Sequence, residues 1–167
     1  MTTMSKMMKR EPKKPTVMKL VDAFSILEDQ HHEINKLFAS FEAMGQKAFL
    51  RKSKIVSEIV DKLNRHLRLE EEFLYPRVKD LDEEMVLESY EEHDLVKQMI
   101  EKIEHTDAND PIYQARVIVL KELVEHHVGE EENDFFPKLR KKLRKTEKEE
   151  LAADLGNSLH LTRVLKM

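Results

Sequence analysis

The chain has 167 residues, the size of one ordinary domain with a single core. Charged residues make up 37% of it and hydrophobic residues 40%, with only three glycines and five prolines, a composition that favours long amphipathic helices over a sheet. The net charge of −4 does not point to nucleic acid, no apolar run approaches the ~18 residues that cross a bilayer, and the lack of cysteine excludes disulfides and thiolate metal ligands.

The first sixteen residues are basic and contain two prolines, and they show no hydrophobic periodicity. They predict a flexible arm rather than a helix, either a disordered tail or an arm that meets a partner. They also lack the apolar segment of a signal peptide. We therefore expect residues 1–16 to form a flexible basic arm and the protein to be cytoplasmic.

Four later segments carry hydrophobic residues at the three- and four-residue steps of one helix face. They cover about residues 17–45, 52–75, 83–105 and 111–136. Pro76 marks the end of the second helix or a kink in it, and Asp110 with Pro111 has the pattern of an N-cap and first helical position. Thr146 and Glu149 form a capping-box pattern, which predicts a short extra helix near the C-terminus.

Four long helices joined by short links predict an all-α fold, an antiparallel four-helix bundle. The chain also repeats itself: the first helix matches the third at an offset of 62 residues, and the second matches the fourth at an offset of 61. This repeat predicts two helix pairs related by a pseudo-twofold axis. We expect the arm over residues 1–16, the bundle over 17–140 and a C-terminal helical extension over 141–167.

Each predicted bundle helix carries one histidine on its apolar face, and the second and fourth helices add a glutamate one turn later. The six polar residues expected to face the core are His31, His66, Glu70, His93, His127 and Glu131. Burying them is costly unless they find partners. Two imidazoles for each of two metals, with two glutamates that bridge the metals, give each metal four protein donors. A bridging oxo or hydroxo group would be the fifth ligand and would leave one position open.

Nitrogen and oxygen donors with an open position favour two non-haem iron ions. Structural zinc usually closes a shell of four ligands that includes cysteine, and magnesium and calcium prefer oxygen donors. Manganese stays an alternative, and zinc is less favoured. A bundle with hydrogen-bonded core histidines and no metal is the remaining alternative. The phrase that runs from His66 to Pro76 and again from His127 to Pro137 weighs against it.

The stretches EDQHHEINKLF, HLRLEEEFLYP, EEHDLV and HHVGEEENDFFP resemble, in order, the four helix motifs of the hemerythrin-like HHE cation-binding family. The resemblance covers about residues 18–140 and implies a four-helix bundle with a non-haem di-iron centre. It places the family's histidines of the first and third helices on His31 and His93. His32 and His126 are then sequence neighbours of the ligands, and they are weaker candidates either to bind the metal or to hydrogen-bond a ligand.

Two positions depart from the pattern of the oxygen-carrying hemerythrins. Lys97 stands where those proteins have a second histidine of the third helix, and Glu132 stands where they have an aspartate. The set of four histidines and two glutamates is similar instead to bacterial proteins linked to repair of iron centres under nitrosative or oxidative stress. Those proteins often carry a cysteine-containing N-terminal segment, whereas this sequence has no cysteine.

Ferritin-like di-iron bundles are a different class, which needs E-x-x-H motifs on two helices. Glu28 and His31 form one such motif, and neither the third nor the fourth helix has a second copy. The sequence therefore disfavours this class.

We expect a protein that binds, senses or reacts with a small ligand such as dioxygen, nitric oxide or peroxide. One alternative is a di-iron oxidoreductase with peroxidase- or ferroxidase-like turnover, for which Tyr75 and Tyr90 are candidate redox residues. Another is a regulatory or interaction bundle with a structural metal, in which the arm or the basic stretch over residues 138–145 meets a partner. A protein partner or a homo-oligomer is compatible with each alternative, and neither nucleic acid nor a membrane is expected.

We predict that the protein is not a reversible oxygen carrier. Reversible carriage needs one saturated iron beside one open iron, an asymmetry that a fifth histidine creates and that Lys97 does not supply. The diferrous protein should therefore oxidise in air without a long-lived oxygenated form, as optical spectra would show. A charge-transfer band that disappears on degassing and returns with oxygen over repeated cycles would contradict the prediction.

Overall fold

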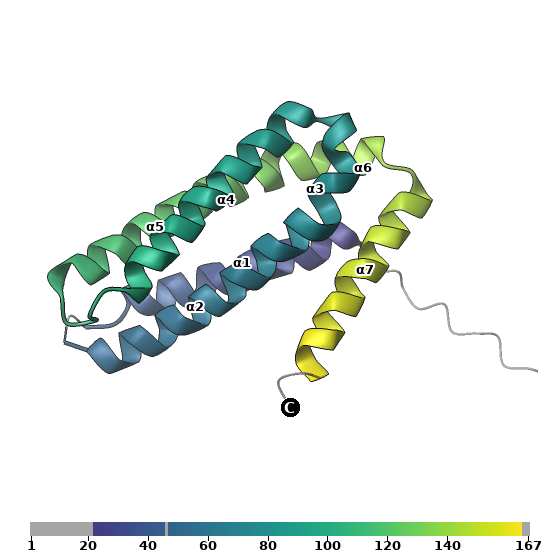
Figure 1. Cartoon of the computed structure of the whole chain (residues 1–167). Helices are drawn as coiled ribbons and strands as arrows, with labels where there is room; N and C mark the ends of the chain where they lie inside the picture. Colours follow the sequence, from purple (N-terminus) through teal and green to yellow (C-terminus); the bar gives the residue numbers. More distant parts are fainter. Residues whose placement is uncertain (1–21, 46, 165–167) are drawn as a thin grey trace, which may run out of the picture.

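The computed structural model describes residues 22–45 and 47–164, and the basic arm expected over residues 1–16 lies outside them. Within these ranges the chain forms helices and no strand. Four long helices build the bundle, namely α1 (Ala23–Glu42), α2 (Phe49–Leu69), α4 (Glu83–Glu104) and α5 (Pro111–Glu130) (Figure 1). The predicted all-α four-helix bundle is confirmed.

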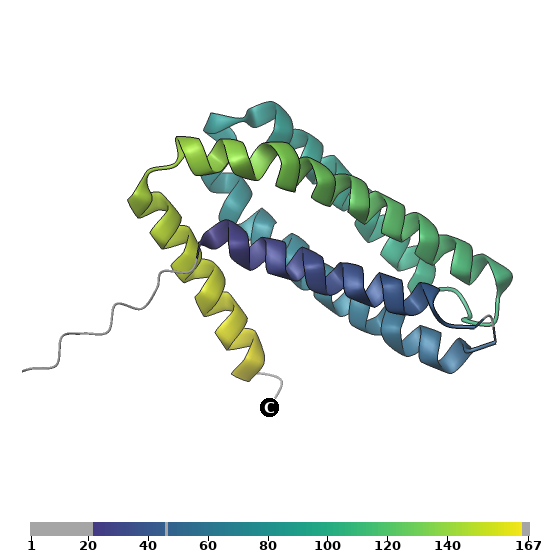
Figure 2. The same ribbon diagram turned by 180° about the vertical axis from the view of Figure 1, so that it is seen from behind.

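The four helices form two hairpins that lie side by side (Figures 1 and 2). α1 packs along α2 and α4 packs along α5, which are the two helix pairs that the internal repeat predicts. At the end away from the hairpin loops, the short helices α3 (Tyr75–Val78) and η2 (Lys79–Leu81) carry the chain from the first hairpin to the second. None of the helices in the described ranges is both long and apolar enough to span a membrane.

Aspartate caps begin α1 and α5. The Asp110 carboxylate accepts a hydrogen bond from the backbone N–H of Ile112 at 2.9 Å, and Pro111 takes the first helical position, as predicted. The Asp22 carboxylate accepts from the backbone N–H of Ser25 at 3.3 Å, so α1 begins at Ala23. Residues 17–21, where we expected the first helix to begin, lie outside the described residues.

The core consists of two apolar clusters with a polar layer between them. The cluster on the side of the hairpin loops includes Ile34 and Leu63. The cluster at the opposite end includes Leu27 and Phe135. The six histidines and glutamates predicted to face the core lie in the helical turns between the two clusters and are buried. Since apolar side chains offer no hydrogen bonds, the polar layer must be satisfied from within or by a bound ion.

Neither Pro76 nor Pro137 ends its helix. The second helix widens into a π-helical turn, η1 (Glu70–Leu74), and continues through α3, while the fourth widens into η3 (Glu131–Phe135) and continues as α6 (Phe136–Lys142). In each turn, the N–H before the proline bonds five residues back, from Tyr75 to Glu70 and from Phe136 to Glu131. A proline lacks the N–H of the ordinary ladder and its ring collides with the carbonyl four residues back, so one extra residue in the turn accommodates it. The fourth helix therefore continues past Pro137 into the basic stretch, as far as Lys142.

The C-terminal helix is longer than expected. α7 (Lys145–Val164) has 20 residues and lies against the start of α1 (Figure 2). The capping box predicted from Thr146 and Glu149 was also wrong, because the Glu147 carboxylate accepts the backbone N–H of Arg144 at 2.7 Å. α6 ends at Lys142 and Leu143 is extended, which fixes where the helix restarts. The division of the chain into arm, bundle and extension stays a prediction.

We predict that α7 stabilises the bundle through Leu155, which is fully buried in the apolar cluster with Phe24 and Phe136. Leu155→Ala should lower the free energy of unfolding by about 2–5 kcal/mol in urea titrations, because it removes buried methyl groups and leaves a cavity. Leu87→Ala is the matched control, since Leu87 is 51% exposed on α4. Equal unfolding midpoints for the two variants would mean that α7 is not part of the core.

Candidate metal centre

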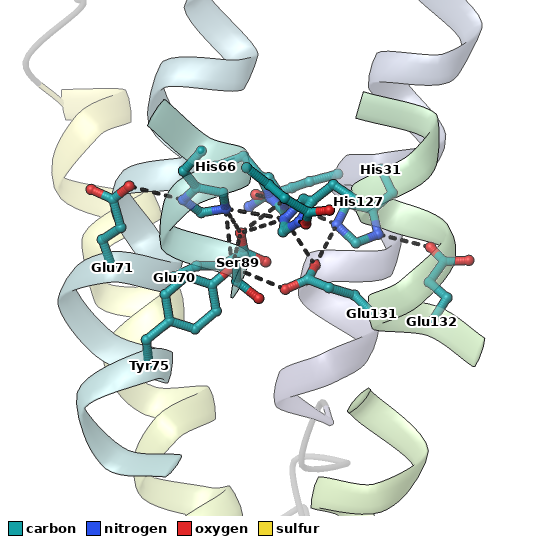
Figure 3. A network of polar contacts seen from close by, with 12 residues as sticks. His31, His66, Glu70, Glu71, Tyr75, Ser89, His127, Glu131 and Glu132 are labelled. Carbon is teal, nitrogen blue, oxygen red and sulfur yellow. Dashed lines mark hydrogen bonds and ion pairs between the residues drawn. The ribbon is translucent and has the colours of Figure 1, made fainter. Parts of the chain in front are cut away.

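All six residues predicted as metal ligands meet in the polar layer, and none is more than 3% exposed. Figure 3 shows His31, His66 and His127 pointing from different helices toward a common centre, with Glu70 and Glu131 beside them. The i,i+4 spacing brings each glutamate next to the histidine of its own helix, at 3.3 Å for His66 and Glu70 and 3.7 Å for His127 and Glu131. The structure therefore brings the predicted set together.

The four imidazoles form two pairs that face each other through their Nε2 atoms. The Nε2 atoms of His31 and His66 are 2.9 Å apart, and those of His93 and His127 are 3.0 Å apart. In both pairs the rings meet edge to face. Each hairpin therefore supplies one pair of inward nitrogen atoms.

The outer nitrogen of each ring, Nδ1, hydrogen-bonds an oxygen on a neighbouring helix. The acceptors are Glu132 for His31 at 2.8 Å, Gln30 for His66 at 2.9 Å, Glu71 for His93 at 2.8 Å and Glu92 for His127 at 2.7 Å. An ionised carboxylate can only accept, so in the neutral ring it keeps the proton on Nδ1 and leaves the Nε2 lone pair pointing inward. This is the tautomer that a metal ligand requires.

The polar layer has unsatisfied groups that fit metal ions. Two Nε2 lone pairs about 3 Å apart repel each other unless a proton or a cation lies near both. Glu70 Oε1 and Glu131 Oε2 are buried without a hydrogen-bond partner among the described residues. Potential ligand atoms lie within 4.8 Å of one another in two groups, one formed by His31, His66, Glu70 and Glu131 and the other by Glu70, His93 and His127. Two cations sharing the glutamates would satisfy all of these groups.

Tyr75 adds a hydroxyl group to one side of the centre. Its Oη lies 3.0 Å from His93 Nε2 and donates to Glu131 Oε1 at 3.1 Å (Figure 3). The ring of Tyr90 packs edge-on against Tyr75, with centroids 5.2 Å apart. Phe136 is the counterpart of Tyr75 in the repeat, and it stacks on His31 at 6.0 Å with no hydroxyl. Sequence reasoning named Tyr75 only as a redox candidate and did not place it among the ligand atoms.

A model of the hemerythrin HHE cation binding domain matches residues 22–139. The chain belongs to this family. A hemerythrin HHE cation binding domain-containing protein from Mycobacterium kansasii has a similar crystal structure, with a TM-score of 0.74 over 86% of this chain and 88% of that one. At 23% identity, this similarity shows the common fold.

A relative named DNA nickase, from Nostoc sp., is 28% identical over 130 residues. The match covers 77% of this chain and 36% of the relative, so the chain spans about a third of that protein's length.

The histidines of this HHE domain differ in basicity. For His66, burial and the neighbouring histidines lower the pKa to about 3, despite the attraction of Glu70. For His31 and His127, burial acts in the same direction but is outweighed by Glu131 and Glu70, which raise both pKa values above 6.5. His66 is also the one histidine of the four whose Nδ1 faces an amide rather than a carboxylate.

The two central glutamates also have opposite tendencies. Burial and the charge of Glu70 raise the pKa of Glu131 above its ordinary value. Burial acts on Glu70 in the same way, but attraction to the surrounding histidines outweighs it and lowers its pKa. Burial together with these two carboxylates raises the pKa of Tyr75 well above 10, so its hydroxyl keeps its proton. The anionic charge of the centre is thus concentrated on Glu70.

The residues that depart from the oxygen carriers lie around the six predicted ligands. The Lys97 ammonium bonds the Glu71 carboxylate at 2.6 Å, and that carboxylate bonds His93, so Lys97 acts on the centre through Glu71. Glu132 lies in the corresponding place beside His31. The exposed His126 contacts Glu92 at 3.3 Å rather than the centre.

Two other predicted candidates lie away from the centre. His32 is exposed on α1. Glu28 pairs with Arg140 at 2.8 Å, so it does not complete the E-x-x-H motif of a ferritin-like site.

Sequence reasoning missed the acceptors Gln30, Glu71 and Glu92. A signal for them was present, because Gln30 and Glu92 directly precede a histidine predicted as a ligand and Glu71 directly follows a glutamate predicted as a ligand. Neighbours in sequence lie about 100° apart around a helix, so such residues can reach the next helix of the bundle. Metal binding by the six predicted residues themselves stays a prediction.

We predict that in the metal-free HHE domain the histidines titrate in separate ranges. His31 and His127 should stay protonated above pH 6.5, whereas His66 should stay neutral down to about pH 3. His31 and His127 then contribute stability that is present below pH 6.5 and is lost as the pH rises through their raised pKa values. His66 acts in the opposite way, destabilising the fold as the pH falls from 6.5 toward 3, because only the unfolded chain then takes up its proton.

Nitrogen-15 NMR of the imidazole rings would measure these pKa values directly. A single common pKa near 6.5 for His31, His66 and His127 would contradict the expectation.

Proposed function

We propose that this HHE domain holds two iron ions and uses them to bind, sense or react with a small ligand such as dioxygen, nitric oxide or peroxide. The observation that carries the proposal is the arrangement of the four Nε2 atoms in two inward pairs. The two buried glutamates connect these pairs. Glu70 Oε2 lies 3.3 Å from both His66 and His93, and Glu131 Oε2 lies 3.4 Å from His31 and 3.7 Å from His127.

The donor set supports iron over the other common metals. Four imidazole nitrogens, two carboxylates and no thiolate suit iron, with manganese as the alternative. His31 and His66 would hold one ion, His93 and His127 the other, and Glu70 and Glu131 would be shared. Bound iron would supply a change of oxidation state and an open position for the ligand.

The surrounding residues keep the six donor side chains in a state that can bind metal. Glu132, Glu71 and Glu92 keep the protons of their histidines on Nδ1, so the Nε2 atoms need no change of tautomer. The apolar clusters above and below exclude bulk water from the layer. Tyr75 holds a proton on Oη beside Glu131 and His93, where it can donate to an anionic group.

A di-iron oxidoreductase acting on peroxide is the second candidate, and the placement of Tyr75 favours it. Its hydroxyl lies among the ligand atoms and its ring contacts Tyr90, which is only partly buried. This pair provides a proton donor at the centre and a chain of two phenol rings toward the surface. The activity in the name of the Nostoc relative is not carried over, because this chain spans 36% of that protein.

We predict about two iron atoms per chain after expression with iron. Glu70→Ala or Glu131→Ala should lower the occupancy of both positions together, because each glutamate would bind both ions. Elemental analysis and Mössbauer spectra measure the loss, and Glu72→Ala on the exposed side of η1 is the control. One tightly held zinc ion, or full iron content in both variants, would show that the dinuclear proposal is wrong.

We predict for the second candidate that Tyr75→Phe keeps the iron content and slows peroxide consumption. A positioned proton donor contributes about a hundredfold to rate at the lower end of its range. Tyr113→Phe is the control, because it removes a tyrosine hydroxyl from the apolar cluster on the side of the hairpin loops and does not alter the centre. If Tyr75→Phe consumes peroxide as fast as the unaltered protein, Tyr75 is not the donor and the second candidate loses its support.

A further inference from the structure

The internal repeat allows the two halves of the centre to be compared residue by residue. His31 corresponds to His93, and His66 corresponds to His127. Their Nδ1 acceptors correspond as well, since Glu132 and Glu71 occupy one repeated position, while Gln30 and Glu92 occupy the other. Three of the four acceptors are carboxylates, and the fourth, Gln30 beside His66, is an amide. The hydrogen-bond pattern is conserved between the halves, but one negative charge is missing.

Without this charge, His66 is a weaker electron-pair donor to a metal, for two reasons. A carboxylate on Nδ1 stabilises the positive charge that an imidazole gains on binding a metal, and a neutral amide does so less well. A carboxylate also fixes the tautomer because it can only accept, whereas an amide group carries both an acceptor and a donor. Trivalent iron depends on ligand charge more than divalent iron does. The position with the amide therefore favours the lower oxidation state.

Lys97 reduces the difference in negative charge between the two halves. Its ammonium bonds Glu71 at 2.6 Å and offsets part of that carboxylate's charge. However, Lys97 is 43% exposed and its effect is screened by solvent. Glu92 is only 16% exposed and bonds His127 directly at 2.7 Å. The directly bonded, better buried carboxylate outweighs the screened ammonium, so the half with Glu92 remains the more electron-rich.

The surroundings of Gln30 do not replace the missing charge. Gln30 lines a pocket of about 520 Å³ between α1, α2 and α7, together with the acidic Asp29 and Glu33 and the basic Lys62 and Arg65. Lys62 pairs with Glu33 at 2.7 Å, and the two acidic side chains match the two basic ones in number. The pocket lining therefore adds no net charge to the His66 half, and the difference between the halves rests on Gln30.

We propose that Gln30 makes the two metal positions unequal, so that the iron held by His31 and His66 is reduced first. This inference rests on the proposed di-iron function. Gln30 is a positioning residue, which acts on the metal through His66 and does not touch it. This difference is one of reduction potential between the two positions, and it leaves the number of protein ligands at each position equal.

The test is an anaerobic reductive titration of the full chain loaded with iron-57, with dithionite as the source of electrons. Mössbauer spectra count ferric and ferrous ions at each point and give the potentials of the first and second electrons. An outer hydrogen-bond partner of a ligand is worth about 10–100-fold in metal affinity. A tenfold change in the ferric-to-ferrous affinity ratio corresponds to about 59 mV for one electron.

Two isosteric variants test the two one-electron reductions separately. Gln30→Glu supplies the missing charge and should lower the first potential by about 59 mV or more. Glu92→Gln removes the corresponding charge and should raise the second potential by a similar amount. The double variant should restore the separation with the order of the two irons reversed. Glu125→Gln, on an exposed part of α5, is the matched control and should change neither potential.

The outcomes distinguish this inference from the proposed function. Fewer than two irons in the unaltered protein would overturn the di-iron function itself. If the protein binds two irons and neither Gln30→Glu nor Glu92→Gln changes a reduction potential, only the role of Gln30 is overturned. The same holds if both variants shift the same electron. Should Gln30→Glu fail to fold, as circular dichroism would show, the selective shift of the second potential in Glu92→Gln decides the question.

Discussion

The structure depends on how six polar side chains are accommodated between two apolar clusters. His31, His66, His93 and His127 direct their Nε2 atoms at one another in pairs, and Glu70 and Glu131 each have a buried oxygen with no hydrogen-bond partner among the described residues. Neither feature is stable in an apolar core by itself. Cations in the layer would remove the repulsion between nitrogens and satisfy both carboxylates. The same groups that destabilise a metal-free core would therefore become the strongest links between the helices.

The local structure that builds this layer is the π-helical turn. Each begins at a central glutamate and ends one residue before the helix resumes, at Glu70–Leu74 and Glu131–Phe135. The added residue rotates the helix face that follows, so that the side chain five positions after the glutamate also reaches the layer. In one half this side chain is Tyr75 and in the other it is Phe136. The π-helical turn thus brings the same position to the layer in both halves, and the difference between tyrosine and phenylalanine there puts a hydroxyl on one side only.

The amino-acid sequence predicts much of this arrangement because its signals are local. Helix periodicity and the i,i+4 spacing of histidine and glutamate placed the six central residues, and the repeat indicated the two hairpins. The π-turns could not be predicted from Pro76 alone, since a proline can end, kink or widen a helix and packing decides which. The capping residue of α7 depends on where α6 ends, so the choice between Glu147 and Glu149 is not a local one. Gln30 and Glu92 act across helices, and their role requires the register between neighbours.

The division of the core into two apolar clusters has a consequence for the cooperativity of folding. Each cluster draws side chains from both hairpins, but the clusters are separated by the polar layer. With metal in place, the layer connects them and the bundle should open as one unit. Without it, the two ends can open independently, and backbone amides near the hairpin loops and those near α7 would exchange with solvent at different rates. A bound metal would then couple the two ends of the bundle, which otherwise unfold as separate cooperative units, whichever small ligand the centre binds.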